Sequence, residues 1–222
     1  MKLYACLLMG IALTASGYAQ QMTPYGQSDP RAKALLDALS KQYKSYHSIK
    51  ATFKLQVINP DGKVADQRTG QAILQGNAYH IQIGGQELIS DGTTTWNYSK
   101  ETNEVQINRY SPDNSLISPT RLFTNFYDQD FLYRLMPDTR EKGKVFQHIE
   151  MTPFDKSKSF FRVDLTIDKA KKQIVKAEIY DKSGVRYIYS IVQFTPNVKV
   201  SSQTFTFNPK SHPGVNVVDL RT

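Results

Sequence analysis

Alternation of apolar and polar residues runs through most of this chain and limits what it can fold into. In the clearest case, 161–168, four large apolar residues alternate with Arg, Asp, Thr and Asp. Because successive side chains of a strand point to opposite faces, a period of two predicts strands with one apolar face. The same reasoning predicts strands at or within 53–57, 79–83, 96–98, 105–107, 175–179, 185–191 and 205–207. Further strands are expected at 64–75, which follows a turn, at 88–89, which a turn ends, and at 145–152.

These segments amount to about eleven strands, most of them joined by short turns that contain Gly, such as 60–62 and 183–184. Strands with one apolar face and short connections are typical of an antiparallel sheet whose other face is wet. The sequence therefore predicts a mainly β (α+β) fold. No linker, repeat or low-complexity stretch divides it, so one domain is expected over 29–222.

One helix is predicted before the first strand. Asp29 suits the N-cap position, because its carboxylate accepts from a free backbone N–H, and Pro30 suits the first helical position. Apolar residues then recur at steps of one, three and four, which places them on one helical face running to about Tyr46. These residues are Ala34, Leu35, Ala38, Leu39 and Tyr43.

A second helix is predicted where the alternation stops. Ser118 and Pro119 resemble a helix cap and first turn, and the apolar residues that follow share one helical face. The next apolar group suits a further helical turn that Pro137 ends. The two groups are Leu122, Phe123, Phe126 and Tyr127, then Phe131, Leu132, Leu135 and Met136.

The N-terminus has the layout of a cleaved export signal. Lys2 precedes an uncharged apolar run over 3–15, and small residues stand at 17 and 19, so cleavage before Gln20 is expected. The run is shorter than the roughly 20 residues that span a bilayer. The sequence thus predicts a signal peptide over 1–19, a flexible lead-in over 20–28 and a periplasmic mature protein. The single cysteine, Cys6, would leave with the signal peptide, so no disulfide or thiol chemistry is expected.

The chain is basic, with a formal net charge of +8. Its lysines and arginines are scattered, apart from three lysines in one predicted turn over 169–172. Two interpretations stay open at this point: an ordinary solvated surface, or attraction to anionic lipid headgroups. Nucleic acid is not expected as a partner in the periplasm.

Catalytic chemistry has no visible motif in this chain. The four histidines have no metal-like spacing, and no nucleophile elbow, phosphate loop or dinucleotide fingerprint occurs. We therefore expect a protein that is not an enzyme and has no catalytic residues, metal or cofactor. The 13 Tyr and 11 Phe form either an ordinary core or the lining of a cavity, and periodicity does not choose between these.

The phase of the alternation predicts which side chains face the concave side of the sheet and would line such a cavity. Because a one-residue slip turns a whole strand over, each of these assignments is all-or-none. The predicted residues are Phe53, Leu55, Ile73, Tyr79, Ile81, Trp96, Tyr98, Phe161, Val163, Leu165, Tyr187 and Tyr189.

The order of elements resembles the LolA family of periplasmic outer-membrane lipoprotein carriers. The most specific part is the strand–turn–strand of 88–98, which ends in Trp96-Asn97-Tyr98. A helix followed by a Phe-containing strand at 35–53, the apolar helix at 118–127, and Phe-Thr-Phe-Asn-Pro with a later Gly-Val at 205–215 match the rest. The resemblance runs from about Ala34 to Arg221.

This resemblance implies an incomplete antiparallel β-barrel of about eleven strands, with helices as a lid over an apolar cavity. Leu122, Phe123 and Phe126 would belong to the lid. The implied function is a monomeric periplasmic chaperone that shields the acyl chains of lipoproteins. It would receive them from an inner-membrane lipoprotein-releasing transporter and pass them to an outer-membrane acceptor or to the membrane itself.

One position departs from the family pattern. The family often has an arginine, thought to latch barrel to lid, where Gly76 stands here, so that role is not carried over. Two other functions remain open: a periplasmic binder of another lipid or amphiphile, and a signalling regulator with the same fold.

Overall fold

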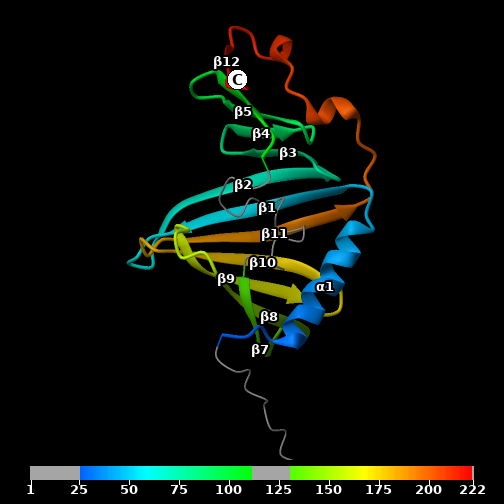
Figure 1. Cartoon of the computed structure of the whole chain (residues 1–222), viewed down its shortest axis with the longest axis vertical. Coiled ribbons are helices and arrows are strands. Elements are labelled where there is room, and N and C mark those ends of the chain that lie inside the picture. Colours follow the sequence, from blue (N-terminus) through cyan, green and yellow to red (C-terminus); the bar gives the residue numbers. More distant parts are fainter. Residues whose placement is uncertain (1–25, 112–130, 222) are drawn as a thin grey trace, which may run out of the picture.

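A computed structural model describes residues 26–111 and 131–221, and it consists mainly of one antiparallel sheet (Figure 1). The sheet order is β12-β6-β5-β4-β3-β2-β1-β11-β10-β9-β8-β7. The edge strands β7 and β12 do not pair with each other in this order, so the barrel is incomplete, as predicted. The strands are β1 (Ile49–Ile58), β2 (Val64–Gln75), β3 (Ala78–Ile83), β4 (Gln86–Ser90), β5 (Thr94–Ser99), β6 (Glu104–Arg109), β7 (Phe131–Glu141), β8 (Lys144–Pro153), β9 (Phe160–Asp168), β10 (Gln173–Asp181), β11 (Arg186–Pro196) and β12 (Asn216–Asp219).

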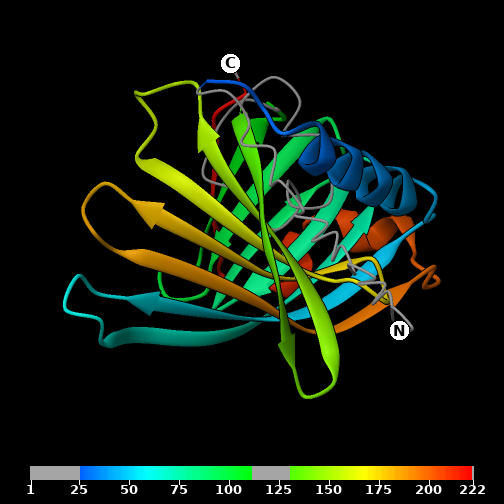
Figure 2. The same cartoon turned by 90° about the horizontal axis from the view of Figure 1, so that it is seen from below.

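The helix α1 (Pro30–Lys44) lies across the concave side of the curled sheet (Figure 2). Asp29 caps it as predicted, because its carboxylate accepts from the Arg31 backbone N–H at 2.8 Å. At the other end, the buried Tyr43 hydroxyl accepts from the backbone N–H of Ile174 in β10 at 2.8 Å. Both ends of α1 are therefore tied down, since the Asp29 N–H also donates to the Tyr133 carbonyl oxygen at 2.9 Å.

The Asp29 carboxylate should make folding pH-dependent. Hydrogen bonds from the Arg31 side chain hold the pKa of Asp29 below its ordinary value. Because folding lowers this pKa, the ionised Asp29 carboxylate stabilises the folded state. This stabilisation is full above the unfolded pKa of about 3.9 and is lost as pH falls through the folded pKa. We expect Asp29→Asn, which keeps a capping oxygen, to lower the free energy of unfolding by about 1 kcal/mol at neutral pH.

Denaturant unfolding of the wild type and Asp29→Asn over a pH series measures this contribution. The difference between the two proteins should shrink steadily as the pH falls below about 4. A difference that stays constant down to acid pH would contradict the assigned role of the charge.

Local register shifts account for several residues that the alternation places on the wrong face. A β-bulge leaves Phe161 of β9 with no residue directly opposite it in β10. Phe160 therefore faces inward, and Phe161 is 48% exposed. Similar shifts occur at Val175 and at Val192. A bulge inserts one extra residue into a strand and so inverts the alternation beyond it.

Two predicted segments take a different secondary structure. Residues 131–136, expected as a helical turn, begin strand β7, and Pro137 falls within a register shift on this edge strand, where a missing N–H is tolerated. Phe205, expected in a strand, ends the 3-10 helix η2 (Ser202–Phe205), which is followed by η3 (Pro209–Ser211). The last strand is instead β12, which pairs parallel to β6.

Some predictions fall on parts of the chain outside the described residues. They are the signal peptide over 1–19, most of the lead-in, and the helix over 118–127 with Leu122, Phe123 and Phe126. Across 26–111 and 131–221, no helix has the length and apolar character needed to cross a membrane.

Candidate functional site

The concave face of the sheet has two halves, and α1 fills one of them. Leu36 and Leu39 of α1 belong to the same buried cluster as Val163 and Leu165 of β9. Val163 is 0% exposed and Leu165 is 1% exposed. These two predicted cavity residues do face the concave side, but they lie in a packed core beneath the helix.

The other half of the concave face carries apolar side chains that remain partly exposed. Phe53, Ala72 and Ile81 form its buried floor. Direct cross-strand partners share one face of a sheet, so the register places the surrounding side chains on the same side. We call this set the concave patch: the floor together with Leu55, Val57, Tyr79, Ile83, Leu88, Tyr187, Tyr189 and Ile191.

A glycine makes the floor of the concave patch possible. A Cβ at Gly70 would stand 2.5 Å from the Phe53 ring and 2.8 Å from the Gln82 carbonyl oxygen. The missing side chain leaves room for the Phe53 ring, whose centroid lies 6.1 Å from that of Tyr189. The ring is 2% exposed and belongs to the buried floor of the patch.

The concave patch is electrically neutral. Burial raises the pKa of the Tyr79 and Tyr189 phenols above the ordinary value, so neither ionises near neutral pH. Arg68 and Asp66 lie on the same face, opposite Leu55 and Val57, and pair with each other at 2.7 Å, so they add no net charge. Apart from this ion pair at its border, the surface offers van der Waals contact, which suits an apolar ligand of variable structure. Among the described residues, no group of three or more His, Cys, Asp or Glu is arranged to hold a metal.

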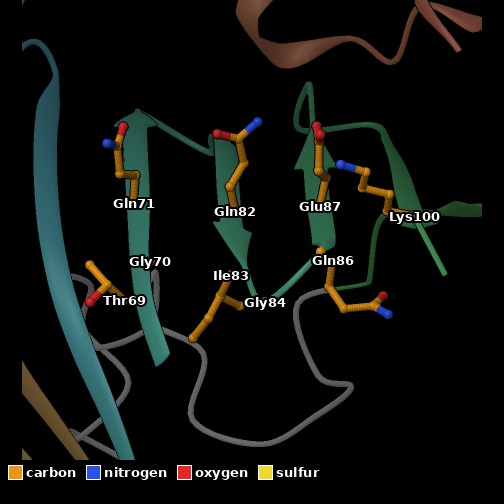
Figure 3. A pocket seen from close by; sticks show the side chains of 10 residues that line it. Thr69, Gly70, Gln71, Gln82, Ile83, Gly84, Gln86, Glu87 and Lys100 are labelled. Atoms are coloured by element: carbon orange, nitrogen blue, oxygen red, sulfur yellow. The ribbon is translucent and has the colours of Figure 1, made fainter. Parts of the chain in front are cut away.

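The outer face of the sheet differs from the concave face at β3. Gln82 is the direct cross-strand partner of Gln71 and of Glu87, so these three polar side chains share the outer face, where Figure 3 shows them side by side. The polar side chains border a pocket of about 340 Å³ that Lys100 also lines. This pocket is mainly polar and therefore a poor match for apolar ligands.

Trp96 and Tyr98 do not face the concave side, so their assignment to the cavity was wrong. The register places them with Ile89 and Val105 on the opposite face of β4–β6. There they pack with Phe207 of the C-terminal segment in a second, separate core. The apolar face of the sheet thus changes sides between β3 and β5, because a different segment covers it.

Ile73 and Phe161 were also wrongly assigned. Ile73 pairs with Lys50 and His80, which puts it on the outer face, and its neighbours Ala72 and Leu74 point inward. Apolar and polar residues do not alternate in this run of three apolar residues, so the sequence could not indicate which of them faces inward. Phe161 points outward because of its bulge. The remaining predicted residues, Phe53, Leu55, Tyr79, Ile81, Tyr187 and Tyr189, lie in the concave patch.

The prediction missed several residues of the patch. Val57 and Ile83 continue the alternation of Leu55 and Ile81, so the period of two itself was a sufficient signal. Leu88 had no such signal, because it stands beside Ile89, which packs in the second core.

Gly76 lies in the turn between β2 and β3, where its φ is +57°. It lines a pocket of about 280 Å³ together with Tyr43, Lys44 and Tyr46 at the end of α1. A side chain at this φ is strained, although a Cβ there would meet no atom within 4 Å. This position is thus near the end of α1, but glycine has no side chain that could donate a hydrogen bond to the helix.

The fold and the patch define a class of protein: an incomplete antiparallel β-barrel whose apolar concave face is covered in part by a helix. The family model for the outer membrane lipoprotein carrier protein LolA matches residues 44–208. The chain belongs to the LolA family.

Two relatives illustrate how far this similarity extends. An outer-membrane lipoprotein carrier protein of Vibrio cholerae is 29% identical over 192 residues, covering 83% of this chain and 90% of the relative. The structure of a conserved protein from Thermus thermophilus has a TM-score of 0.58 at 15% identity, covering 85% of this chain and 99% of that chain. The second likeness concerns the fold alone.

Proposed function

We propose that this protein is a periplasmic carrier that shields the acyl chains of lipoproteins between the inner and the outer membrane. The observation that carries the proposal is the concave patch, a neutral apolar surface that α1 leaves partly exposed. Membership of the LolA family and the predicted signal peptide support it. A lipoprotein-releasing transporter would supply the cargo, and an acceptor protein or the outer membrane would receive it.

The physical task fits such a surface. Each acyl methylene removed from water contributes about 0.8 kcal/mol, so bare chains would aggregate or return to a membrane. A carrier must also release its cargo, so binding that is too tight is a disadvantage. Contacts with Leu, Ile and Tyr side chains adapt to different chains better than a polar cage does.

Uptake of a fluorescent fatty-acyl probe by the mature protein tests this proposal. We expect saturable binding that a diacylated peptide displaces and the same peptide without acyl chains does not. No saturable uptake over a range of acyl lengths would mean that the patch is closed to acyl chains, as in an ordinary packed core.

The same experiment distinguishes the other functions. A binder of a different lipid or amphiphile would take up the probe without displacement by the acylated peptide, and mass spectrometry of co-purified lipid would then identify its ligand. A signalling regulator would bind a partner protein and need no probe uptake at all.

A further inference from the structure

Three segments that are far apart in the sequence meet at the end of the barrel where α1 stops. The Tyr43 hydroxyl of α1 accepts from the Ile174 N–H, next to the β9–β10 turn, at 2.8 Å. The Asn197 N–H, after β11, donates to the Ser48 carbonyl oxygen at 2.7 Å, and the Ser48 hydroxyl donates to the Val198 carbonyl oxygen at 2.6 Å. We call this surface the basic end, formed by residues 41–50, 168–172 and 196–200.

The basic end carries most of the net charge of the protein. It contains seven lysines, all exposed, and no arginine, whereas the whole chain has a formal net charge of +8. Its one acidic residue is Asp168, which is 4% exposed and accepts from the backbone N–H groups of Ala170 and Lys171. The lysines are Lys41, Lys44, Lys50, Lys169, Lys171, Lys172 and Lys199.

Most of these ammonium groups are not neutralised by the protein itself. Lys169 pairs with Asp138 of β7 at 2.9 Å. In the described parts of the chain, the other six lysines of the basic end form no ion pair with a carboxylate. Six like charges on one surface repel each other. An anionic partner would relieve this repulsion without breaking any ion pair of these lysines within the protein.

The concave face reaches the surface at this same end. The pocket of about 280 Å³ beside Gly76 has apolar walls from Ile49 and Leu74, with Lys44 and His47 at its edge. Leu74 pairs directly with Tyr79 of the concave patch, so both side chains lie on the same face. An apolar chain that left the patch past the end of α1 would emerge beside Lys44 and His47.

We propose that the basic end docks on an anionic phospholipid surface and directs the concave patch toward the membrane. The inference rests on the carrier function proposed above and names the surface through which cargo is exchanged. A symmetric dimer that brings two basic ends together is disfavoured, because the two ends repel each other.

The choice of lysine favours a membrane over an acidic protein. Lysine is a flexible, strongly hydrated point charge, whereas arginine forms the planar bidentate pairs that fix one partner geometry. Interfaces between proteins are accordingly depleted in lysine and enriched in arginine. The three segments of the basic end contain seven lysines and no arginine, which suits the diffuse charge of mobile headgroups.

Flotation of the mature protein with vesicles tests the proposal. Wild type should bind phosphatidylcholine vesicles that contain phosphatidylglycerol and not pure phosphatidylcholine vesicles. Binding should disappear at an ionic strength of about 0.5 M, where screening confines charge interactions to about 4 Å. The triple variant Lys41→Gln, Lys171→Gln and Lys199→Gln, one change per segment, should bind about a hundredfold more weakly, since each lysine near the surface contributes about 1 kcal/mol.

A matched control removes the same charge from the opposite end of the barrel. Lys63→Gln, Lys156→Gln and Lys182→Gln lie in the β1–β2, β8–β9 and β10–β11 connections, and this triple variant should bind vesicles like the wild type. Equal loss in both triple variants would mean that only total charge matters, and it would overturn the proposal. So would wild type that fails to float with anionic vesicles, in which case an acidic protein surface is the partner to test.

Probe uptake in solution separates this proposal from the carrier function. All three proteins should take up the fatty-acyl probe equally, because none of the changed lysines lies in the concave patch. If all three proteins take up the probe but vesicle binding does not depend on the basic-end lysines, the proposed docking surface is wrong and the carrier function is unaffected. Absent uptake in the wild type overturns the carrier function.

Discussion

Leu88→Asp should abolish acyl binding and leave the protein folded. Leu88 lies in the concave patch opposite Ile81 of β3 and is partly exposed, so a carboxylate there stays hydrated while the patch is empty. An acyl chain would have to cover that charge without pairing it, which is costly in an apolar environment. We expect probe affinity to fall at least about a hundredfold, which corresponds to about 3 kcal/mol.

The matched control is Gln82→Asp in the neighbouring strand. Gln82 is exposed on the outer face, where Figure 3 shows its side chain among polar neighbours, so probe binding should be unchanged. Circular dichroism melts of both variants establish that they are folded. If Leu88→Asp binds the probe like the wild type, acyl chains do not lie on the concave patch, and a site elsewhere must be sought.

Tyr43→Ala should destabilise the whole domain. The Tyr43 ring is 4% exposed and lies 5.9 Å from that of Phe194, and its hydroxyl accepts the buried Ile174 N–H. Removing a large buried aromatic costs about 3–5 kcal/mol, and the unpaired N–H adds to this. At roughly 2–4 °C per kcal/mol for a domain of this size, we expect Tm to fall by about 10 °C or more.

Two comparisons isolate the causes of that loss. Tyr43→Phe keeps the ring and removes only the hydroxyl, so it should cost about 1–2 kcal/mol. Lys41→Ala changes an exposed residue of the same helix and should leave Tm nearly unchanged. If Tyr43→Ala instead keeps the wild-type Tm and accelerates probe exchange, α1 is a detachable lid and not part of the core.

Much of this architecture follows from local sequence. The turn at 60–62 predicts that a strand follows over 64–75, and these are the observed bounds of β2. Asp29 and Pro30 predict the start of α1, because only a few residue types satisfy the free N–H groups of a first turn. Each of these signals depends on neighbours in the chain, so one sequence suffices to detect it.

The bulges of β9 and β10 could not be predicted from local sequence. The run Phe160-Phe161 offers two equally apolar candidates for the core, and the register with β10 decides that Phe160 is buried. The alternation of a strand can be recognised from its own sequence. A β-bulge, which adds one residue and shifts the alternation to the other face, depends on how the strand pairs with its neighbour.

Taken by itself, the sequence determined that the chain forms a meander of strands with an N-terminal helix, because periodicity and capping are local. The tertiary structure decided which face of each strand is covered and by what. Trp96 and Tyr98 share a face as their spacing predicts, but Phe207, about a hundred residues later, covers that face on the outside of the sheet. Likewise, α1 buries Val163 and leaves Tyr189 partly exposed, although both face the concave side. Burial depends on contacts between distant segments, and alternation contains no information about them.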